Sequence, residues 1–386
     1  MSKHFLRSGL VAAACAATLA VGGTAAHAQD TIKIGSFLAV SGPAAFLGDP
    51  EKKTLELYVD KINEEGGVLG KQIELVLYDS GMDAAKAVTL VKRLIDQDEV
   101  EAIIGGTTTG ETMAVVGEVE QAEIPFISLG GASVIVDPVK KWVFKTPHTD
   151  RVAVGKAFAD MQKEGITKVG LIGGAGGFDK SCLANADALA PEYGLEVVAT
   201  ETYGSGDTDM TPQLTKLRNA EGIQGVMFCG FGAASTIVTK NYRQLGIDVP
   251  FYHNHGSCSL RFVQGSEGAA EGVRLPCAAL LVADQLPDDD PQKEVGLAYA
   301  AAYSGAYGEE ISTFGGHAYD ALFLLVGAIE RAGSTDKAAV RDALEATENF
   351  VGVDGIFTMG ADNHVGLDLD SFKMLEVRDN DWSYLY

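Results

Sequence analysis

Hydrophobic positions along the first third of the chain alternate between two periods. Residues 31–37 alternate with the period of two that is typical of a strand, whereas Leu55, Val59 and Ile62 recur at helical spacing on one face. The same change of period repeats downstream. It predicts strands at 72–79, 102–105 and 125–128 and helices at 84–96 and 111–122. Strict alternation of this kind predicts a parallel sheet with helices on both faces.

The alternation of strands and helices begins again after residues 142–148. The second series comprises helix 151–164, strand 169–172, helix 179–193, strand 195–200, helix 211–220, strand 225–228 and a strand ending near Tyr252. The last part predicts helices at 292–307, 315–332 and 336–346 and a closing pair of strands at 355–359 and 372–377. With 386 residues the chain exceeds what one hydrophobic core usually organises, so we expect two similar α/β lobes.

The first residues have the pattern of a secretory signal. Lys3 and Arg7 precede an apolar run at 10–22, and Ala26-His27-Ala28 is typical of a cleavage site. We therefore expect residues 1–28 to be a signal peptide that is cleaved after Ala28. The alternative is a membrane anchor, but the apolar run is short for a spanning helix.

The charge of the chain disfavours some partners, and its cysteines bear on disulfides and metal binding. The net charge is −23 at pH 7, and so acidic a chain repels nucleic acid and anionic lipid. The exported part contains Cys182, Cys229, Cys258 and Cys277. Export permits disulfides, and Cys258–Cys277 is the preferred pair, with free buried thiols as the alternative. The cysteines lack the spacing of zinc ligands, so we expect no metal.

Small and hydroxyl-bearing residues follow two neighbouring predicted strands. Thr107-Thr108-Thr109-Gly110 ends a strand and begins a helix, where unpaired N–H groups and hydroxyls suit a carboxylate. Ordinary N-capping by the same residues is the alternative. Residues 128–133 (Ser-Leu-Gly-Gly-Ala-Ser) follow the next strand, and their glycines permit either close approach of a ligand or a tight turn.

The loops of the second half give weaker signals. Residues 173–178 follow a strand and precede a helix but do not keep the GxGxxG spacing, so we expect no nucleotide cofactor. Phe178 is expected to face a cleft, with core packing as the alternative. His253 and His255 lack a third ligand, which favours a hydrogen-bonding histidine in a cleft, or an exposed one, over a metal site. Linear enzyme motifs such as GxSxG and HExxH are absent.

Several motifs together resemble the branched-chain amino acid (leucine/isoleucine/valine) binding proteins of ABC importers. They are Ile34-Gly35, Ser41-Gly42-Pro43-Ala44, the block Ile62-Asn63-Glu64-Glu65-Gly66-Gly67-Val68-Leu69-Gly70-Lys71, Asp79, Ala84-Ala85-Lys86-Ala87-Val88, Ile124-Pro125-Phe126-Ile127-Ser128 and Tyr319-Asp320-Ala321. The resemblance covers essentially the whole exported chain.

The resemblance implies the type I periplasmic binding protein fold, with two doubly wound parallel-sheet lobes joined by a three-strand hinge. We expect lobe one at 29–148 and 281–356, and lobe two at 149–280 and 357–386. The implied protein is periplasmic and monomeric, has no cofactor and catalyses no reaction. It closes by hinge motion on a small ligand and delivers it to the permease subunits of an ABC importer.

The ligand contacts of the resembled family carry over position by position onto loops of both lobes. They fall on Phe46 or Leu47, Thr108 and Thr109, Gly130, Ala132 or Ser133, Phe178, Phe231 and His255. Amino-acid binders have an acidic residue at the position of His255, which pairs with the α-ammonium of the ligand. A desolvated ammonium opposite an imidazole would lack its counter-charge, at a cost of several kcal/mol.

We therefore expect a carboxylate ligand that lacks an α-amino group. An aromatic acid of the benzoate or hydroxycinnamate type is favoured, with its ring between Phe178 and Phe231 and a distal oxygen bonded by His255. The alternative ligand is a branched-chain or other hydrophobic amino acid. The alternative classes are a ligand-binding receptor domain and an enzyme with its active site in the cleft.

Overall fold

The computed structural model describes residues 31–204 and 206–386. The expected signal peptide, residues 1–28, lies outside the described residues. Within the described ranges, the longest apolar helices are still too short or too polar to cross a membrane.

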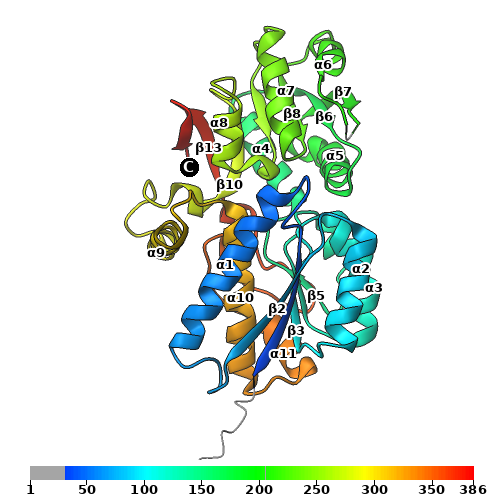
Figure 1. Cartoon of the computed structure of the whole chain (residues 1–386). Helices are drawn as coiled ribbons and strands as arrows, with labels where there is room; N and C mark the ends of the chain where they lie inside the picture. The colour runs from blue at the N-terminus through cyan, green and yellow to red at the C-terminus, as the bar shows by residue number, and fades with distance from the viewer. Residues whose placement is uncertain (1–30, 205) are drawn as a thin grey trace, which may run out of the picture. The chain divides into compact units, whose positions relative to one another are not determined.

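A five-stranded parallel sheet with its helices forms the first lobe (Figure 1). The strand order is β2-β1-β3-β4-β5, with β1 between β2 and β3. The strands are β1 (Ile32–Leu38), β2 (Ile73–Asp79), β3 (Ala102–Gly105), β4 (Phe126–Ser128) and β5 (Val143–Lys145). The helices are α1 (Ala45–Glu64), α2 (Ala84–Asp96), α3 (Thr109–Ala122), η1 (Ser133–Ile135), α9 (Pro291–Tyr307), α10 (Thr313–Ala332) and α11 (Lys337–Glu345).

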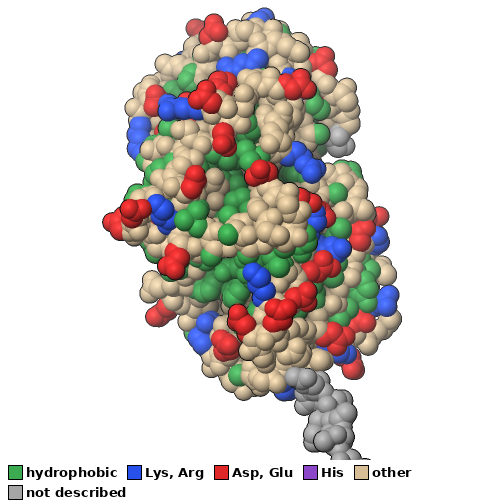
Figure 2. All heavy atoms as spheres, turned by 60° about the vertical axis from the view of Figure 1, so that its left-hand side comes forward, with side chains coloured by type: hydrophobic (Ala, Val, Ile, Leu, Met, Phe, Trp, Pro, Cys, Tyr) green, Lys and Arg blue, Asp and Glu red, His purple; other side chains and the backbone are tan. Residues whose placement is uncertain are grey.

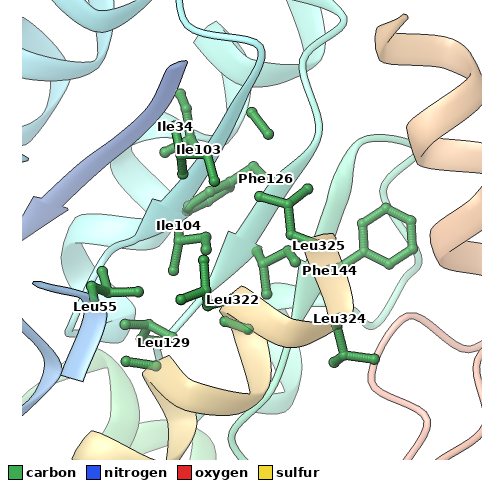
Figure 3. Close-up of a cluster of buried hydrophobic side chains, with 14 of the residues drawn as sticks. Ile34, Leu55, Ile103, Ile104, Phe126, Leu129, Phe144, Leu322, Leu324 and Leu325 are labelled. Carbon is green, nitrogen blue, oxygen red and sulfur yellow. The ribbon is translucent and has the colours of Figure 1, made fainter. Parts of the chain in front are cut away.

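Helices cover both faces of this sheet, as the alternating pattern predicts. Helix α1 packs along α10 on one face, and α2 packs on α3 on the other (Figure 1). Strand β3 is buried throughout because a central parallel strand meets helices on both sides. Figure 3 shows side chains of β1, β3 and β4 meeting α10. Labelled residues of this core are Ile34, Leu55, Ile103, Ile104, Phe126, Leu129, Phe144, Leu322, Leu324 and Leu325.

Helix ends in the first lobe follow local sequence signals. The carboxylate of Asp83 accepts hydrogen bonds from two N–H groups in the first turn of α2, and Ser312 caps α10 in a similar way. Helix α10 ends at Gly333, whose φ of 62° is the left-handed conformation that glycine adopts without strain.

A seven-stranded sheet forms the second lobe, with the order β14-β13-β10-β9-β8-β6-β7. Its parallel strands are β6 (Lys168–Gly173), β7 (Glu196–Thr202), β8 (Gly225–Cys229), β9 (Phe251–His253) and β10 (Arg274–Ala278), and its antiparallel strands are β13 (Phe372–Arg378) and β14 (Asp381–Tyr384). The helices are α4 (Asp150–Lys163), α5 (Gly177–Leu189), η2 (Ala190–Tyr193), α6 (Thr211–Arg218), α7 (Ala233–Gln244), η3 (His255–Ser257) and α8 (Leu260–Gly265).

Three segments connect the two lobes, and the predicted fold class is confirmed. The chain passes from β5 to α4, from β10 through η4 (Ala279–Val282) to α9, and from the first core through η5 (Leu369–Ser371) to β13. The exact lobe boundaries stay a prediction. Residues 357–367 supply Phe357, Met359, Val365 and Leu367 to the hydrophobic core of the first lobe.

The predicted closing pair of strands does not form. Strand β12 (Ile356–Phe357) pairs with β11 (Phe350–Val351) in a separate hairpin, while β13 pairs with β10 and β14. Both predicted segments are extended, but their partners were set by the tertiary fold. Strand β10 itself gave a weak sequence signal because Pro276 lies at its centre.

Two disulfides lie in the second lobe. Cys258 bonds Cys277, which is the preferred pair of the sequence analysis. Cys182 of α5 also bonds Cys229 at the end of β8, a pair that the sequence did not indicate. The two cysteines are 47 positions apart and meet because α5 packs on β8.

The charge of the chain is spread over the surface. On the face drawn in Figure 2, acidic and basic side chains are intermixed, and hydrophobic surface is exposed between them in the middle of the view. The net negative charge therefore does not gather into one continuous acidic patch on this face.

Candidate functional site

Loops from both lobes enclose a cavity at the carboxyl ends of the parallel strands. It contains about 440 Å³ of space between protein atoms, part of it open to solvent. The residues that line it are Leu47, Thr107, Thr108, Thr109, Leu129, Gly131, Pro147, Phe178, Phe231, His255, Gly256, Phe314 and His317. Open α/β sheets bind their ligands at this edge.

Two of the three threonines after β3 use their hydroxyls within the protein. The hydroxyl of Thr107 donates to Glu51 at 2.5 Å and accepts from the N–H of Ala39. Thr108 is the N-cap of α3 and exchanges hydrogen bonds with Glu111 in a capping box. The Thr-x-x-Glu spacing of Thr108 and Glu111 is a sequence signal that predicts this cap.

Thr109 has the one hydroxyl of the three that is free for a ligand. Its Oγ1 is buried, and no described residue makes a hydrogen bond to it. Thr109 is also the first residue of α3, where backbone N–H groups lack helical partners. The two interpretations of this loop therefore apply to neighbouring residues, with capping by Thr108 and an available hydroxyl at Thr109.

The second lobe contributes an aromatic wall. Phe178 lies at the start of α5, Phe231 follows β8, and the two rings pack edge to face with centroids 5.8 Å apart. His255, after β9, packs against the ring of Phe178 at 5.3 Å. The two phenyl rings contact each other directly, so the expected position of a ligand ring between them is already filled by this contact.

His255 is a neutral polar group on this wall. Its ring is 7% exposed, and in the described part of the chain neither ring nitrogen makes a regular hydrogen bond. Burial lowers the pKa of His255 well below its usual value, and nearby Lys145, His148 and His317 lower it further, against a weaker effect of the His148 carbonyl. A neutral imidazole offers a ligand one donor and one acceptor.

His317 of α10 faces the cavity from the first lobe and is oriented by Asp354. Its Nδ1 lies 2.5 Å from Oδ2 of Asp354. Burial lowers the pKa of His317 to about 3 and raises the pKa of Asp354 well above its usual range. The loop that contains Asp354 is held by Asp320, which accepts hydrogen bonds from the N–H groups of Val353 and Asp354.

A buried lysine supports the cavity from the first connection between the lobes. The ammonium of Lys145 donates to the carbonyls of Pro147 and His148 at 2.5 and 3.1 Å, and it lies 3.5 Å from the carbonyl of Gly131. Burial lowers the pKa of Lys145 to about 7. Because Gly131 and Pro147 both line the cavity, this side chain fixes the position of two backbone segments of the site.

Gly131, together with Leu129, lines the cavity from the loop after β4. A Cβ atom at this position would lie 2.8 Å from the ring of Phe178 and 3.1 Å from Nε2 of His255. The backbone of the first lobe therefore approaches the aromatic wall of the second so closely that only glycine fits.

The other residues named for this loop are occupied elsewhere. The N–H of Gly130 donates to the Ser128 hydroxyl at 3.0 Å. The hydroxyl of Ser133 accepts from the side-chain amide of Asn185 in α5 at 3.0 Å, a hydrogen bond between the lobes outside the cavity. Ala132 is buried and does not line the cavity.

Of the two residues expected at the entrance, Phe46 and Leu47, only one lines the cavity. Leu47 lines the cavity, whereas Phe46 packs edge to face on Phe314 at 5.8 Å and does not line it. Of the residues named from the sequence, six line the cavity: Leu47, Thr108, Thr109, Phe178, Phe231 and His255.

Sequence reasoning missed the contributions of α10 and of the first connection. Phe314 and His317 lie about 200 positions beyond the threonine loop. The nearest signal was the Tyr319-Asp320-Ala321 motif, which follows directly. Leu129, Gly131 and Pro147 follow strand ends, but an apolar residue, a glycine and a proline there are common in ordinary loops.

Comparison with known proteins identifies relatives along nearly the whole chain. A family model described as periplasmic binding protein matches residues 31–376. The leucine-, isoleucine-, valine-, threonine- and alanine-binding protein of Pseudomonas aeruginosa is 26% identical over 336 residues, which cover 86% of this chain and 87% of that protein. The Leu/Ile/Val-binding protein homolog 7 of Brucella melitensis is 27% identical, with 90% and 87% covered.

Solved structures share the fold. An extracellular ligand-binding receptor from Rhodopseudomonas palustris HaA2 superposes with a TM-score of 0.85 at 27% identity, over 92% of this chain and all of that one. The branched-chain amino acid transporter substrate-binding protein of Streptococcus pneumoniae, solved in complex with isoleucine, superposes with a TM-score of 0.78 at 27% identity, with 92% and 100% covered.

Proposed function

Since the chain belongs to the periplasmic binding protein family, we propose that it binds a carboxylate ligand without an α-amino group, preferably an aromatic acid, for an ABC importer. In this proposal the protein is exported to the periplasm, acts as a monomer and passes its ligand to membrane permease subunits. It catalyses no reaction, in keeping with the binding proteins among its relatives.

The observation that carries the ligand class is the chemistry of the cavity lining. Within residues 31–204 and 206–386, the lining includes two histidines and three threonines but no Asp, Glu, Lys or Arg. His255 is neutral and unpaired, so it cannot supply the counter-charge of an ammonium. A desolvated ammonium without a carboxylate partner would cost several kcal/mol, which disfavours an α-amino group in this cavity.

The same lining suits a carboxylate. The free hydroxyl of Thr109 and the N–H groups at the start of α3 are donors that need no rearrangement to meet an anion. Lys145, whose pKa burial lowers to about 7, adds a partial positive charge behind Gly131 and Pro147, although its own hydrogen bonds go to backbone carbonyls. This part of the cavity therefore offers hydrogen-bond donors to a ligand, and no carboxylate among the described lining residues would repel an anion there.

The remaining lining favours an aromatic body. Phe178 and Phe231 present an edge-to-face pair, and Leu47, Leu129 and Phe314 add apolar surface. A ring packed against such a wall gains aromatic contact in addition to burial. His255, on the same wall, can bond a distal oxygen of the ligand.

The second candidate ligand is a branched-chain or other hydrophobic amino acid. The names of the relatives in Pseudomonas and Brucella and the isoleucine complex from Streptococcus favour it. In that case a carboxylate outside the cavity lining would have to reach the ammonium.

Calorimetric titration of ligand-free protein with leucine, valine, 4-hydroxybenzoate and p-coumarate tests the proposal. We expect micromolar or tighter binding of at least one aromatic acid and none of the amino acids. Tight binding of leucine without binding of either aromatic acid would refute the aromatic-acid proposal. Chromatography of each bound compound after overnight incubation with the protein would reveal turnover if the chain were an enzyme.

A further inference from the structure

A second space, here called the outer chamber, adjoins the ligand cavity. It holds about 1040 Å³ including space open to solvent, and it shares Thr108, Thr109, Phe178 and Phe231 with the cavity. Its other lining residues are Pro43, Phe46, Met82, Ala84, Gly110, Glu111, Gly174, Ala175, Gly176, Gly177, Asp179, Tyr203, Gly232, Ala233 and Ala234. A ligand that contacts Thr109 and Phe178 can therefore extend from one space into the other.

Asp179 is a buried carboxylate on the wall of the outer chamber with one unused oxygen. The residue is 6% exposed. Its Oδ2 accepts a hydrogen bond from the N–H of Gly176 at 3.1 Å, which caps α5. Its Oδ1 is buried, and no described residue donates to it. Capping of α5 uses only Oδ2 of Asp179. The buried Oδ1 therefore has no role in capping this helix.

Tyr203 places a second unused polar group in the same chamber. Its ring stacks on Phe228 at 6.1 Å, and among residues 31–204 and 206–386 its hydroxyl has no hydrogen-bond partner. A Cβ atom at Gly174 would lie 2.7 Å from Oδ2 of Asp179 and 3.0 Å from the Tyr203 ring. Both side chains therefore contact the same stretch of backbone and lie close together.

The charge of the outer chamber favours a hydrogen-bond donor. Among the described residues, its lining contains two carboxylates and no Lys, Arg or His. Glu111 is already bonded to Ser80 and Thr108, which leaves Asp179 as the acceptor with free capacity. A buried acceptor without a partner costs free energy that a donor from a ligand would recover.

We propose that Asp179 and Tyr203 form a second polar subsite, which receives a hydroxyl or ammonium group at the far end of the ligand whose carboxylate is bound at Thr109. The inference rests on the proposed function, because it places the other end of the same molecule, and it assigns the distal hydroxyl to Asp179 and Tyr203 instead of His255. It predicts that the protein discriminates between ligands by a donor group rather than by ring size alone.

Burial raises the pKa of Asp179 to about 6, so the carboxyl is mostly ionised at pH 7.5 and acts as an acceptor there. Hydrogen bonds to ionised groups are among the stronger ones in proteins, and losing one weakens binding about tenfold or more. Tyr203 can accept or donate, so it serves either a hydroxyl or an ammonium.

The test compares matched ligands on matched variants at pH 7.5. Cinnamate and p-coumarate differ by one hydroxyl, and leucine supplies an ammonium. Asp179→Asn keeps an oxygen for the Gly176 N–H, and Tyr203→Phe removes only a hydroxyl. Asp187→Asn is the control, because Asp187 is an exposed residue of the same helix and makes the same change of charge. Circular dichroism of each variant checks that it folds.

We expect Asp179→Asn to weaken p-coumarate binding at least tenfold and cinnamate binding less than threefold, with a smaller loss in Tyr203→Phe and none in Asp187→Asn. Equal effects on the two acids, or none, would overturn the subsite while leaving the aromatic-acid proposal intact. If leucine alone binds, both proposals fail, because its α-ammonium lies next to its carboxylate and cannot reach a subsite at the far end of the ligand. Failure of all three compounds to bind the wild type would refute both.

Discussion

The Nδ1 atom of His317 lies 2.5 Å from Oδ2 of Asp354, and this contact fixes the orientation of an imidazole on the ligand cavity. Asp354 is fully buried and does not line the cavity itself. Two residues that are remote from the threonine loop in sequence therefore decide how one polar group is oriented on the cavity wall. The same principle operates in metal and catalytic sites, where a carboxylate behind a histidine fixes the orientation of its ring.

Replacing Asp354 tests how this orientation is maintained. Asp354→Ala should lower the free energy of unfolding by about 3 kcal/mol, because it leaves the buried imidazole without an acceptor. Asp354→Asn keeps an acceptor oxygen and should stay within about 1 kcal/mol of the wild type. Urea denaturation of both variants measures the difference. Equal losses would show that the charge of Asp354, and not its hydrogen bond, stabilises the pair.

Thr109 and Thr108 should respond differently to the same substitution. Thr109→Val removes an unpaired hydroxyl, so we expect unchanged stability and about tenfold weaker carboxylate binding. Thr108→Val removes the N-cap of α3 and should cost about 1 kcal/mol of stability. Calorimetry and thermal unfolding separate the two effects. Thr89→Val, on the exposed face of α2, is the control, and unchanged affinity in Thr109→Val would remove Thr109 from the site.

Gly131→Ala should prevent the lobes from approaching as closely as they do here. The added methyl group would overlap the ring of Phe178, which belongs to the other lobe, while each lobe keeps its own core. We expect ligand affinity to fall at least tenfold with little loss of stability. Small-angle X-ray scattering should show no compaction when ligand is added. Gly117→Ala, at an open position in α3, is the control, and similar compaction in both variants would contradict this steric explanation.

Asp179 should make the free energy of unfolding fall as the pH rises, whereas a salt-bridged carboxylate makes it increase. Its folded pKa of about 6 lies above the ordinary value of 3.8 for an aspartate, so its ionised form is disfavoured in the folded state. Ionisation of the buried carboxyl therefore lowers the free energy of unfolding above pH 6, and this loss diminishes as the pH falls from 6 towards 4. Asp179→Asn should therefore raise the unfolding free energy at pH 7.5 by up to about 3 kcal/mol.

The gain from Asp179→Asn should shrink to about 0.5 kcal/mol at pH 4, where the folded carboxyl is protonated and the unfolded one is only partly ionised. Thermal unfolding at pH 7.5, 6 and 4 measures this trend. A gain that is constant across these pH values would indicate that the substitution acts through packing rather than through charge.

The Cys182–Cys229 disulfide should matter to the site as well as to stability. It joins α5, which carries Phe178, to the end of β8, two residues before Phe231. Replacing both cysteines by serine should cost about 4 kcal/mol for a loop of 47 residues, against about 3 kcal/mol for the 19-residue loop of Cys258–Cys277.

Binding measurements on the two double-serine variants distinguish their roles. We expect loss of Cys182–Cys229 to weaken ligand binding beyond its effect on folding, since the aromatic pair loses its covalent link. Loss of Cys258–Cys277 should affect stability more than affinity. Identical affinity in both variants and the wild type would show that the aromatic wall is positioned by packing alone.

Much of the fold could be predicted because periodicity reports burial directly. A central parallel strand such as β3 must be apolar throughout, and a helix lying on the sheet must be apolar on one face. These constraints are local, so they can be found in any window of the chain. Pairing partners are not local, which is why 355–359 was recognised as extended and assigned to the wrong partner.

The sequence alone indicated the two α/β lobes, the loops that line the cavity and His255, which stands at a position that is acidic in the resembled family. These depend on residue type and spacing, which a linear pattern contains. Only the tertiary structure decided which hydroxyl is free, because Glu51 and Glu111 occupy Thr107 and Thr108 but not Thr109. It also brought His317 to the cavity, since hydrogen-bond partners and close contacts depend on distances in space that spacing along the chain does not encode.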